Sequence, residues 1–195
     1  MAWYSNIFKP MADWIIALIL SFLLFPVIAF LTIINGLVFK RPFFVQNRIG
    51  KNEASFMFYK FRSMKKDGDE ASIPSWGRFM RKSSLDELPQ LLNILRGEMS
   101  FVGPRPLLPE YLKHYSKEQA QRHLVKPGIT GLAQVKGRNT LSWKNSLELD
   151  TYYSNNQSFA LDFSILVQTV FQVFKFNEVD EVSGQSRKPF NKIDE

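Results

Sequence analysis

The sequence predicts a mainly helical α+β protein, in which a membrane helix precedes a β-hairpin and a compact domain with interfacial amphipathic helices. Three observations lead to this fold class. Residues 14–39 contain no charged side chain. Two strand-like runs then flank a glycine-containing turn within residues 43–64. Helical spacing of apolar residues follows from residue 76 onwards. We therefore divide the chain into a membrane anchor (1–40), a soluble domain (41–177) and a polar, flexible tail (178–195).

The anchor is predicted from the run WIIALILSFLLFPVIAFLTIINGLVF, residues 14–39. It exceeds the roughly 20 residues that span a bilayer as a helix. It is too long for a secretory signal peptide and ends in Phe39-Lys40-Arg41 rather than in small residues. A chain of 195 residues is also too short to surround such a helix completely.

The course of the anchor through the membrane is left open by its residues. Lys9 precedes the run and Lys40-Arg41 follow it, so positive charge flanks both ends. The positive-inside rule therefore does not separate a full span from a hairpin whose ends both stay in the cytoplasm. Pro26 removes a backbone hydrogen bond near the middle and can bend the helix, although spanning helices also tolerate proline.

In the soluble domain, strands at 43–50 and 55–64 are joined by Gly50-Lys51-Asn52 as a β-hairpin. Helices are expected at 76–82, 83–97, 109–124, 143–153 and 159–176, and a glycine-rich loop with short extended pieces at 126–139. The last helix carries an apolar stripe that packs on the core or lies in the lipid interface: Phe163, Leu166, Val170, Val173 and Phe174.

The charge balance indicates a partner that carries phosphate. Lys and Arg number 25 against 18 Asp and Glu, which gives a formal charge of +7 and a pI near 9.6. Nucleic acid, anionic lipid and phosphorylated small molecules all fit such a surface. The absence of Cys excludes disulfides, thiolate metal sites and cysteine nucleophiles. Neither a GxGxxG fingerprint nor a P-loop is present, so a dehydrogenase or kinase has no support.

The adjacent acids Asp86 and Glu87 admit two interpretations. Ser84 and Glu87 have the spacing of a capping box, which explains the pair without any chemistry. A helix N-terminus also keeps a carboxylate ionised, as a nucleophile requires. Adjacent helical residues point about 100° apart, so Asp86 can attack phosphorus while Glu87 holds Mg²⁺.

Three basic residues are candidates for the positive half of such a site. Arg105 lies between Pro104 and Pro106, which restrict its backbone, and arginine binds phosphate through two hydrogen bonds. Lys60 lies in the second predicted strand and Arg138 in the glycine-rich loop. None of the three is specific by itself, because most Lys and Arg side chains are solvated.

Taken together, three motifs behind one apolar anchor resemble the bacterial sugar transferase family. They are YKFRSM (59–64), SSLDELPQLLNILRGEMSFVGPRP (83–106) and KPGITGLAQVKGRN (126–139). More narrowly, the chain is similar to the small monotopic phosphoglycosyl transferases. The resemblance covers residues 13–174, and the chain looks like the minimal catalytic form of the family. By this resemblance, residues 41–177 would be the cytoplasmic catalytic domain.

The resemblance implies a ping-pong reaction on undecaprenyl phosphate. Asp86 would attack the sugar-linked phosphate of a UDP-sugar, release UMP and pass the sugar phosphate to the lipid. Glu87, with Asp86, would hold Mg²⁺. Lys60, Arg105 and Arg138 would bind substrate phosphate. The implied location is the bacterial inner membrane with the domain facing the cytoplasm, in contact with membrane lipid and without a nucleic-acid partner; the oligomeric state and the sugar stay open.

The resemblance also implies that the anchor is a re-entrant helix, broken in the family at a Ser-Pro pair. This chain has Phe25-Pro26 at that place, so the proline of the pair is present and the serine is not. The alternative function is a membrane-anchored basic module that binds nucleic acid or acidic lipid without catalysis. That alternative accounts for the charge and the anchor, but not for the paired acids or for Arg105 between two prolines.

Overall fold

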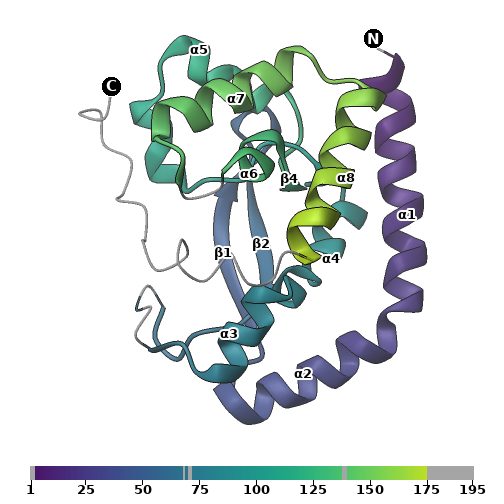
Figure 1. Ribbon diagram of the computed structural model, residues 1–195, viewed down its shortest axis with the longest axis vertical. Helices are drawn as coiled ribbons and strands as arrows, with labels where there is room; N and C mark the ends of the chain where they lie inside the picture. The colour runs from purple at the N-terminus through teal and green to yellow at the C-terminus, as the bar shows by residue number, and fades with distance from the viewer. Residues whose placement is uncertain (1–2, 68, 70–71, 138–139, 175–195) are drawn as a thin grey trace.

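The structure is a computed structural model that describes residues 3–67, 69, 72–137 and 140–174. Figure 1 shows a central β-hairpin with helices around it and a bent N-terminal helix along one side and below. A π-helical turn, η1 (Tyr4–Phe8), leads into the two arms of the bent helix, α1 (Lys9–Leu23) and α2 (Phe25–Phe39).

The remaining helices of eight residues or more are α3 (Ser75–Lys82), α7 (Trp143–Asn155) and α8 (Phe159–Phe174). The shorter helical pieces are η2 (Lys51–Glu53), η4 (Leu85–Glu87), α4 (Gln90–Leu95), η5 (Pro109–His114), α5 (Lys117–Ala120), η6 (Gln121–Leu124) and α6 (Leu132–Lys136). The strands are β1 (Phe43–Ile49), β2 (Ser55–Phe61), β3 (Ser100–Val102) and β4 (Gly128–Thr130).

The bend of the apolar helix lies where Pro26 predicts it. Leu24 separates the two arms with φ −91° and ψ 0°, outside the helical region. Pro26 is the second residue of α2 and has no N–H to donate to the carbonyl of Phe22. The two arms consequently run in different directions, α1 down one side of the domain and α2 beneath it (Figure 1). Within the described residues, Tyr4–Leu23 alone meets the length and hydropathy expected of a membrane-crossing helix.

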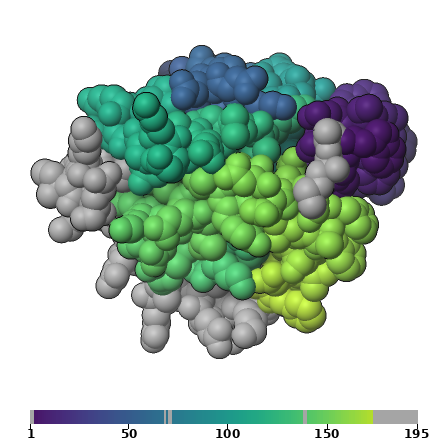
Figure 2. Space-filling model, turned by 90° about the horizontal axis from the view of Figure 1, so that it is seen from above, coloured from purple at the N-terminus to yellow at the C-terminus, as the bar shows by residue number. Residues whose placement is uncertain are grey.

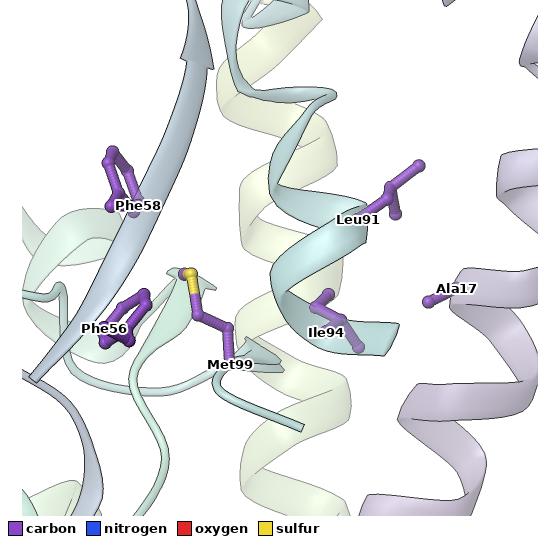
Figure 3. Packing of buried hydrophobic residues seen from close by; sticks show 6 residues of the cluster. All are labelled: Ala17, Phe56, Phe58, Leu91, Ile94 and Met99. Carbon is purple, nitrogen blue, oxygen red and sulfur yellow. The ribbon is translucent and has the colours of Figure 1, made fainter. Parts of the chain in front are cut away.

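The first arm packs into the core of the domain. Ala17 of α1 is fully buried, and its small side chain lets α1 approach α4 closely. It belongs to a cluster that also contains residues of β2, α4 and the segment before β3 (Figure 3): Phe56, Phe58, Leu91, Ile94 and Met99. The membrane helix is therefore part of the core and not an appendage joined by a linker.

A buried carboxylate connects α1 to the C-terminal helices. Asp162, at the start of α8, accepts hydrogen bonds from Lys9 Nζ, Tyr4 Oη and Tyr153 Oη, each 2.6 Å long. Tyr153 Oη also lies 3.0 Å from the carbonyl oxygen of Val102 in β3. Figure 2 looks onto this end of the molecule, where the start of α1 lies beside α8. Four elements thus meet at one anionic group, which is satisfied by three donors.

The second arm is held by Leu31 and Asn35. Leu31 packs with Phe61 of β2 and Met80 of α3. Asn35 is fully buried, and its Nδ2 donates to the carbonyl oxygens of Pro42 at 3.0 Å and Arg62 at 2.9 Å. Its Oδ1 accepts from Trp76 Nε1 of α3 at 2.7 Å. Both arms therefore dock on the same domain.

The β-hairpin is confirmed, with β1 and β2 antiparallel and Phe44 opposite Lys60. The parallel pair β3–β4 is not predicted by the sequence, since each strand has three residues and shows no periodicity. Glycine permits this pairing: a Cβ on Gly128 would lie 2.1 Å from the backbone nitrogen of Gly103. Of the three glycines in residues 126–139, Gly128 thus lies in strand β4 and Gly131 directly follows it.

Two predicted helices and one predicted loop differ from the structure. Residues 83–97 are not one helix, because the 3₁₀ turn η4 precedes α4. Residues 109–124 form η5, α5 and η6 in place of a single helix. In the segment 126–139, β4 is one of the short extended pieces expected there, whereas the helix α6 is not predicted. The predictions of α3, α7 and α8 are confirmed within the described residues, while the tail at 178–195 lies outside them.

The apolar stripe of α8 does not pack on the core. Phe163, Leu166 and Val170 are exposed, whereas Ile165 on another face of the helix is fully buried. The side chains of Val173 and Phe174 lie outside the described set. The exposed stripe is consistent with the lipid-interface interpretation.

We expect Asp162→Leu to destabilise the protein strongly. The substitution removes the nearer carboxylate of the buried Lys9 ammonium and leaves only Asp13, at 3.9 Å, which costs up to about 3–5 kcal/mol. Thermal unfolding of the detergent-solubilised protein measures this loss. Asp67→Leu is the matched control, because the Asp67 side chain is 52% exposed and its ion pair with Arg62 is worth about 1 kcal/mol or less. Equal shifts for the two variants would contradict the role assigned to Asp162.

Candidate active site

Asp86 and Glu87 occupy the 3₁₀ turn η4, immediately before α4. The capping box predicted for Ser84 and Glu87 is wrong. Ser84 has φ +55° in the left-handed region and its side chain makes no capping hydrogen bond, whereas an N-cap residue needs an extended backbone. The left-handed conformation of a serine costs about 1–2 kcal/mol, and such strain is concentrated at functional sites.

Four of the predicted site residues converge. Lys60 Nζ lies 2.5 Å from Glu87 Oε1 and 3.6 Å from Asp86 Oδ2. Arg105 approaches the same Glu87 oxygen from the other side, with Nη1 at 3.4 Å and Nη2 at 3.5 Å. The fifth predicted residue, Arg138, lies outside the described residues. A strand, a 3₁₀ turn and the segment after β3 thus supply one cluster of two carboxylates and two cations.

The two carboxylates have opposite pKa shifts. Burial raises the pKa of Asp86, and the negative charge of Glu87 adds to this effect, while Lys60 opposes it. Burial also disfavours the ionised form of Glu87, but Lys60 and Arg105 outweigh burial and lower its pKa to about 2. Glu87 is therefore a firmly ionised acceptor, whereas the Asp86 carboxylate is poorly compensated by its surroundings.

An aromatic ring makes cation–π contacts with two basic residues at the site, Lys60 and Arg48. The buried ring of Phe58 lies 5.6 Å from Lys60 Nζ and 5.7 Å from the guanidinium carbon of Arg48. Burial and the nearby charge of Arg105 lower the pKa of Arg48 to about 10. Arg48 is a site residue that sequence reasoning missed, although alternation within β1 places it on the same face as Phe44, opposite Lys60.

The chain around Arg105 is fixed through four consecutive carbonyl groups. Pro104 O accepts from the backbone N–H of Gly128 at 3.0 Å, and Leu107 O accepts from that of Ile49 at 3.1 Å. Pro106 O accepts from Arg48 Nη1 at 3.3 Å, and Arg105 O accepts from Arg122 Nη2 at 2.7 Å. The prolines restrict φ, and these bonds fix the direction of the peptide groups, so the Arg105 side chain starts from a rigid backbone.

Arg122 is held in turn by a buried ion pair. Its Nη2 lies 2.8 Å from Asp150 Oδ2, and both side chains are less than 10% exposed. No sequence pattern links Arg122 in η6 to Asp150 in α7, which are 28 residues apart. This pair was missed, and only the folded arrangement shows that it supports Arg105.

The carboxylates fit a hard cation such as Mg²⁺. Among the described residues no cluster of three or more metal-ligating side chains exists. Mg²⁺ does not require one, because it is commonly bound by one or two carboxylates together with substrate phosphate and water. Glu87 and Asp86 supply two adjacent carboxylates, of which Glu87 Oε1 is already engaged by Lys60.

Comparison with known proteins agrees with this geometry. Residues 4–176 match the family described as bacterial sugar transferase. The chain belongs to the bacterial sugar transferase family. The resemblance carried by the three sequence motifs is thereby confirmed, and so is the expectation of a phosphoglycosyl transferase at the level of the family. The alternative of a binding module without catalysis loses its support.

Relatives of the sugar transferase differ in length. It is 46% identical over 156 residues to the uncharacterized sugar transferase EpsL of Bacillus subtilis, covering 76% of this chain and 77% of EpsL. It is 38% identical over 192 residues to the UDP-glucose:undecaprenyl-phosphate glucose-1-phosphate transferase of Xanthomonas campestris, covering 87% of this chain and 39% of that protein. An undecaprenyl-phosphate galactose phosphotransferase of Salmonella typhimurium is 36% identical over 153 residues, 66% of this chain and 32% of its own length. The chain thus spans less than half of the two longer relatives.

We expect the two adjacent acids of the sugar transferase to affect stability with opposite signs. The raised pKa of Asp86 means that folding disfavours its ionised form, so Asp86→Asn raises the melting temperature at pH 7. The lowered pKa of Glu87 means that its ionised form stabilises the fold above pH 4.5 and loses this effect as the pH falls towards 2. Glu87→Gln therefore lowers the melting temperature, and it lowers the free energy of unfolding by about 1–3 kcal/mol.

Thermal unfolding of the purified protein in detergent at pH 7 measures both effects. Lowering the pH towards the ordinary pKa range of aspartate should narrow the gap between wild type and Asp86→Asn, because protonation of Asp86 removes the same unfavourable charge. Shifts of the same sign for the two substitutions would contradict the electrostatic assignment.

Proposed function

We propose that the protein transfers a sugar 1-phosphate from a UDP-sugar to undecaprenyl phosphate by a ping-pong mechanism. The observation that carries the proposal is the buried Asp86 carboxylate beside Glu87, with Lys60 and Arg105 arranged around the pair. The names of relatives support the substrate classes, since two of them act on undecaprenyl phosphate and one of these is named for UDP-glucose. The reaction would be the first membrane step in the assembly of a glycoconjugate.

In the first half-reaction, an oxygen of Asp86 attacks the phosphorus that carries the sugar. A new O–P bond forms, and the bond between this phosphorus and the oxygen bridging to the uridine phosphate breaks, so UMP leaves with that oxygen. In the second half-reaction, a phosphate oxygen of undecaprenyl phosphate attacks the same phosphorus. The bond to Asp86 breaks, the carboxylate is restored, and undecaprenyl diphosphate-sugar is the product.

The environment of Asp86 suits a nucleophile. A carboxylate that is buried and incompletely compensated is a stronger nucleophile than a solvated one, because no water shell has to be removed before attack. Lys60 and Arg105 offset the charge of the incoming phosphate, and Arg105 is suited to bind two of its oxygens. Arg138 is assigned to the same phosphate on the family motif. A covalent intermediate allows one pocket to serve both substrates in turn.

Mg²⁺ would be held by Glu87, with Asp86 next to it, and by phosphate oxygens of the donor. It would supply charge neutralisation of the diphosphate as UMP leaves. The low pKa of Glu87 keeps its carboxylate ionised and available at neutral pH. Lys60 orients Glu87 and holds a positive charge next to Asp86.

The bent anchor is proposed to be re-entrant, with the domain on the cytoplasmic face of the bacterial inner membrane. Support comes from the docking of both arms, because Ala17 of α1 and Asn35 of α2 are buried against the same domain. A straight span would carry one arm across the membrane. Phe22, Leu23 and Phe25 at the bend are 81%, 64% and 67% exposed and form the tip that would enter the lipid. The exposed stripe of α8 would lie in the interface.

We expect Asp86→Asn to abolish the release of UMP. The amide of Asn cannot form the proposed acyl-phosphate (mixed anhydride) linkage, so the loss should be at least about 10³-fold with the fold intact. A panel of UDP-sugars assayed for UMP release, with undecaprenyl phosphate and Mg²⁺ present, measures the effect and identifies the sugar. Glu98→Gln is the control, because Glu98 lies outside the carboxylate cluster and accepts a hydrogen bond from Asn93 Nδ2. Activity of Asp86→Asn within a few-fold of wild type would refute the nucleophile.

The covalent intermediate has its own test. With the acceptor withheld, the peptide that contains Asp86 should carry the mass of one phosphosugar, and the adduct should be labile in acid. Its absence during active turnover would indicate direct transfer between the two substrates.

We expect both ends of the anchor to be labelled from the cytoplasmic side alone. The chain contains no cysteine, so Ala2→Cys, Lys40→Cys and Phe22→Cys provide single labelling sites. In inverted membrane vesicles a membrane-impermeant maleimide should label the first two, and in right-side-out vesicles neither. Phe22→Cys, at the tip of the bend, should resist labelling in both. Labelling of Ala2→Cys from the outer side would show that the anchor spans the membrane.

A further inference from the structure

A polar cavity lies on the domain side of α1, away from the carboxylate cluster. Its volume is about 450 Å³, and its walls come from the first turns of α1, the hairpin turn, the segment after η6 and the end of α7. The hairpin separates the two places: Lys51 follows the Ile49–Ser55 end of the ladder, whereas Lys60 lies at the other end, opposite Phe44. No group of the cavity contributes to the shifted pKa of Asp86. The cavity is therefore a separate site.

Among the described residues, two lysines of this cavity form no ion pair, and the carboxylate that lines it, Asp13, lies 3.9 Å from Lys9. Lys9 is committed to Asp162 at 2.6 Å. Within the described part of the chain, by contrast, no carboxylate lies within 4.0 Å of Lys51 or Lys126. Burial, together with the positive charges of Lys51 and Lys9, lowers the pKa of Lys126, and Asp13 only partly opposes this. Ammonium groups that repel one another in a cavity are stabilised by a bound anion.

The helical wall of the cavity has an unusual backbone. Residues Tyr4–Phe8 form a π-helix, a rare conformation that is frequent at functional sites. Two polar residues of this turn, Ser5 and Asn6, line the cavity. On the outer side of the same helix, Ile7 and Met11 are 51% and 59% exposed. The wall thus separates a polar, basic interior from an apolar surface.

We propose that this cavity binds the phosphate of an anionic phospholipid headgroup, with Lys51 and Lys126 as its cationic ligands. The arrangement supplies both parts that such a lipid requires. The ammonium groups and the amide of Asn6 receive the phosphate and its polar substituent, and the exposed apolar face of α1 receives the acyl chains. Trp3, which is 64% exposed next to the π-turn, is a residue type typical of the level of lipid headgroups. The group that the cavity would recognise is a phosphate ester, which is present in such lipids and also in soluble molecules.

The test compares two charge-matched double variants of the full-length protein. Lys51→Gln with Lys126→Gln removes the proposed ligands, and Lys117→Gln with Lys144→Gln removes the same charge from exposed positions on α5 and α7. Each protein is purified in detergent, mixed with equal amounts of phosphatidylglycerol and phosphatidylcholine, and analysed by native mass spectrometry. We expect the wild type and the control to retain phosphatidylglycerol preferentially, and the site variant to lose this preference by about tenfold.

A second experiment identifies the source of the phosphate. In lipid-free detergent, inorganic phosphate is titrated against the melting temperature of the same three proteins. A rise that requires Lys51 and Lys126, without any lipid preference, would assign the cavity to a soluble phosphate ester and overturn the lipid assignment. Equal lipid retention by the site and control variants, or no preference in the wild type, would overturn the proposal. UMP release by the site variant in detergent should remain unchanged, because neither lysine belongs to the proposed catalytic cluster.

Discussion

Packing of the apolar N-terminal helix into the core of the domain is the constraint on which the rest of the structure depends. Ala17 of α1 lies in the same buried cluster as Phe58, whose ring supports Lys60, and Leu91, which follows the acidic turn. A shift of the anchor would therefore move the strand and the turn that hold the carboxylates. Side-chain packing thereby sets the distance between the apolar helix and the candidate site, which suits the proposed reaction of one water-soluble and one lipid substrate.

The carboxylate cluster shows how stability and chemistry are divided between neighbours. Glu87 takes nearly all the favourable contacts, since Lys60 and Arg105 both approach its Oε1. Lys60 Nζ lies 3.6 Å from Asp86, and Arg81 and Arg105 add weaker attraction, but burial outweighs these charges and raises the pKa of Asp86. A single turn thereby contains one acid whose charge is well compensated and one whose charge is poorly compensated. Such unequal surroundings are a frequent mark of sites where two titratable groups have different roles.

Local pattern predicts the elements of this protein that have enough residues to show a period. The hairpin and α7 were predicted in this way, and so was the bend, because one proline acts through its own missing N–H. The capping box failed although its spacing is right, since the turn that places Asp86 needs Ser84 in a left-handed conformation. Strands β3 and β4 are too short for any period. The support of Arg105 by Arg122 depends on tertiary contacts, which no spacing encodes.

Polar groups buried at both ends of the bent helix explain how an apolar segment docks in one orientation. Leucine and isoleucine surfaces pack almost equally well in several rotations, whereas a buried charge or amide has few satisfied positions. Lys9 on α1 meets Asp162, and Asn35 on α2 meets two backbone carbonyls and Trp76. A rotation of either arm would leave these groups unpaired in an apolar environment. The two polar contacts therefore fix which face of the bend meets the domain, and they leave the apolar face free for lipid.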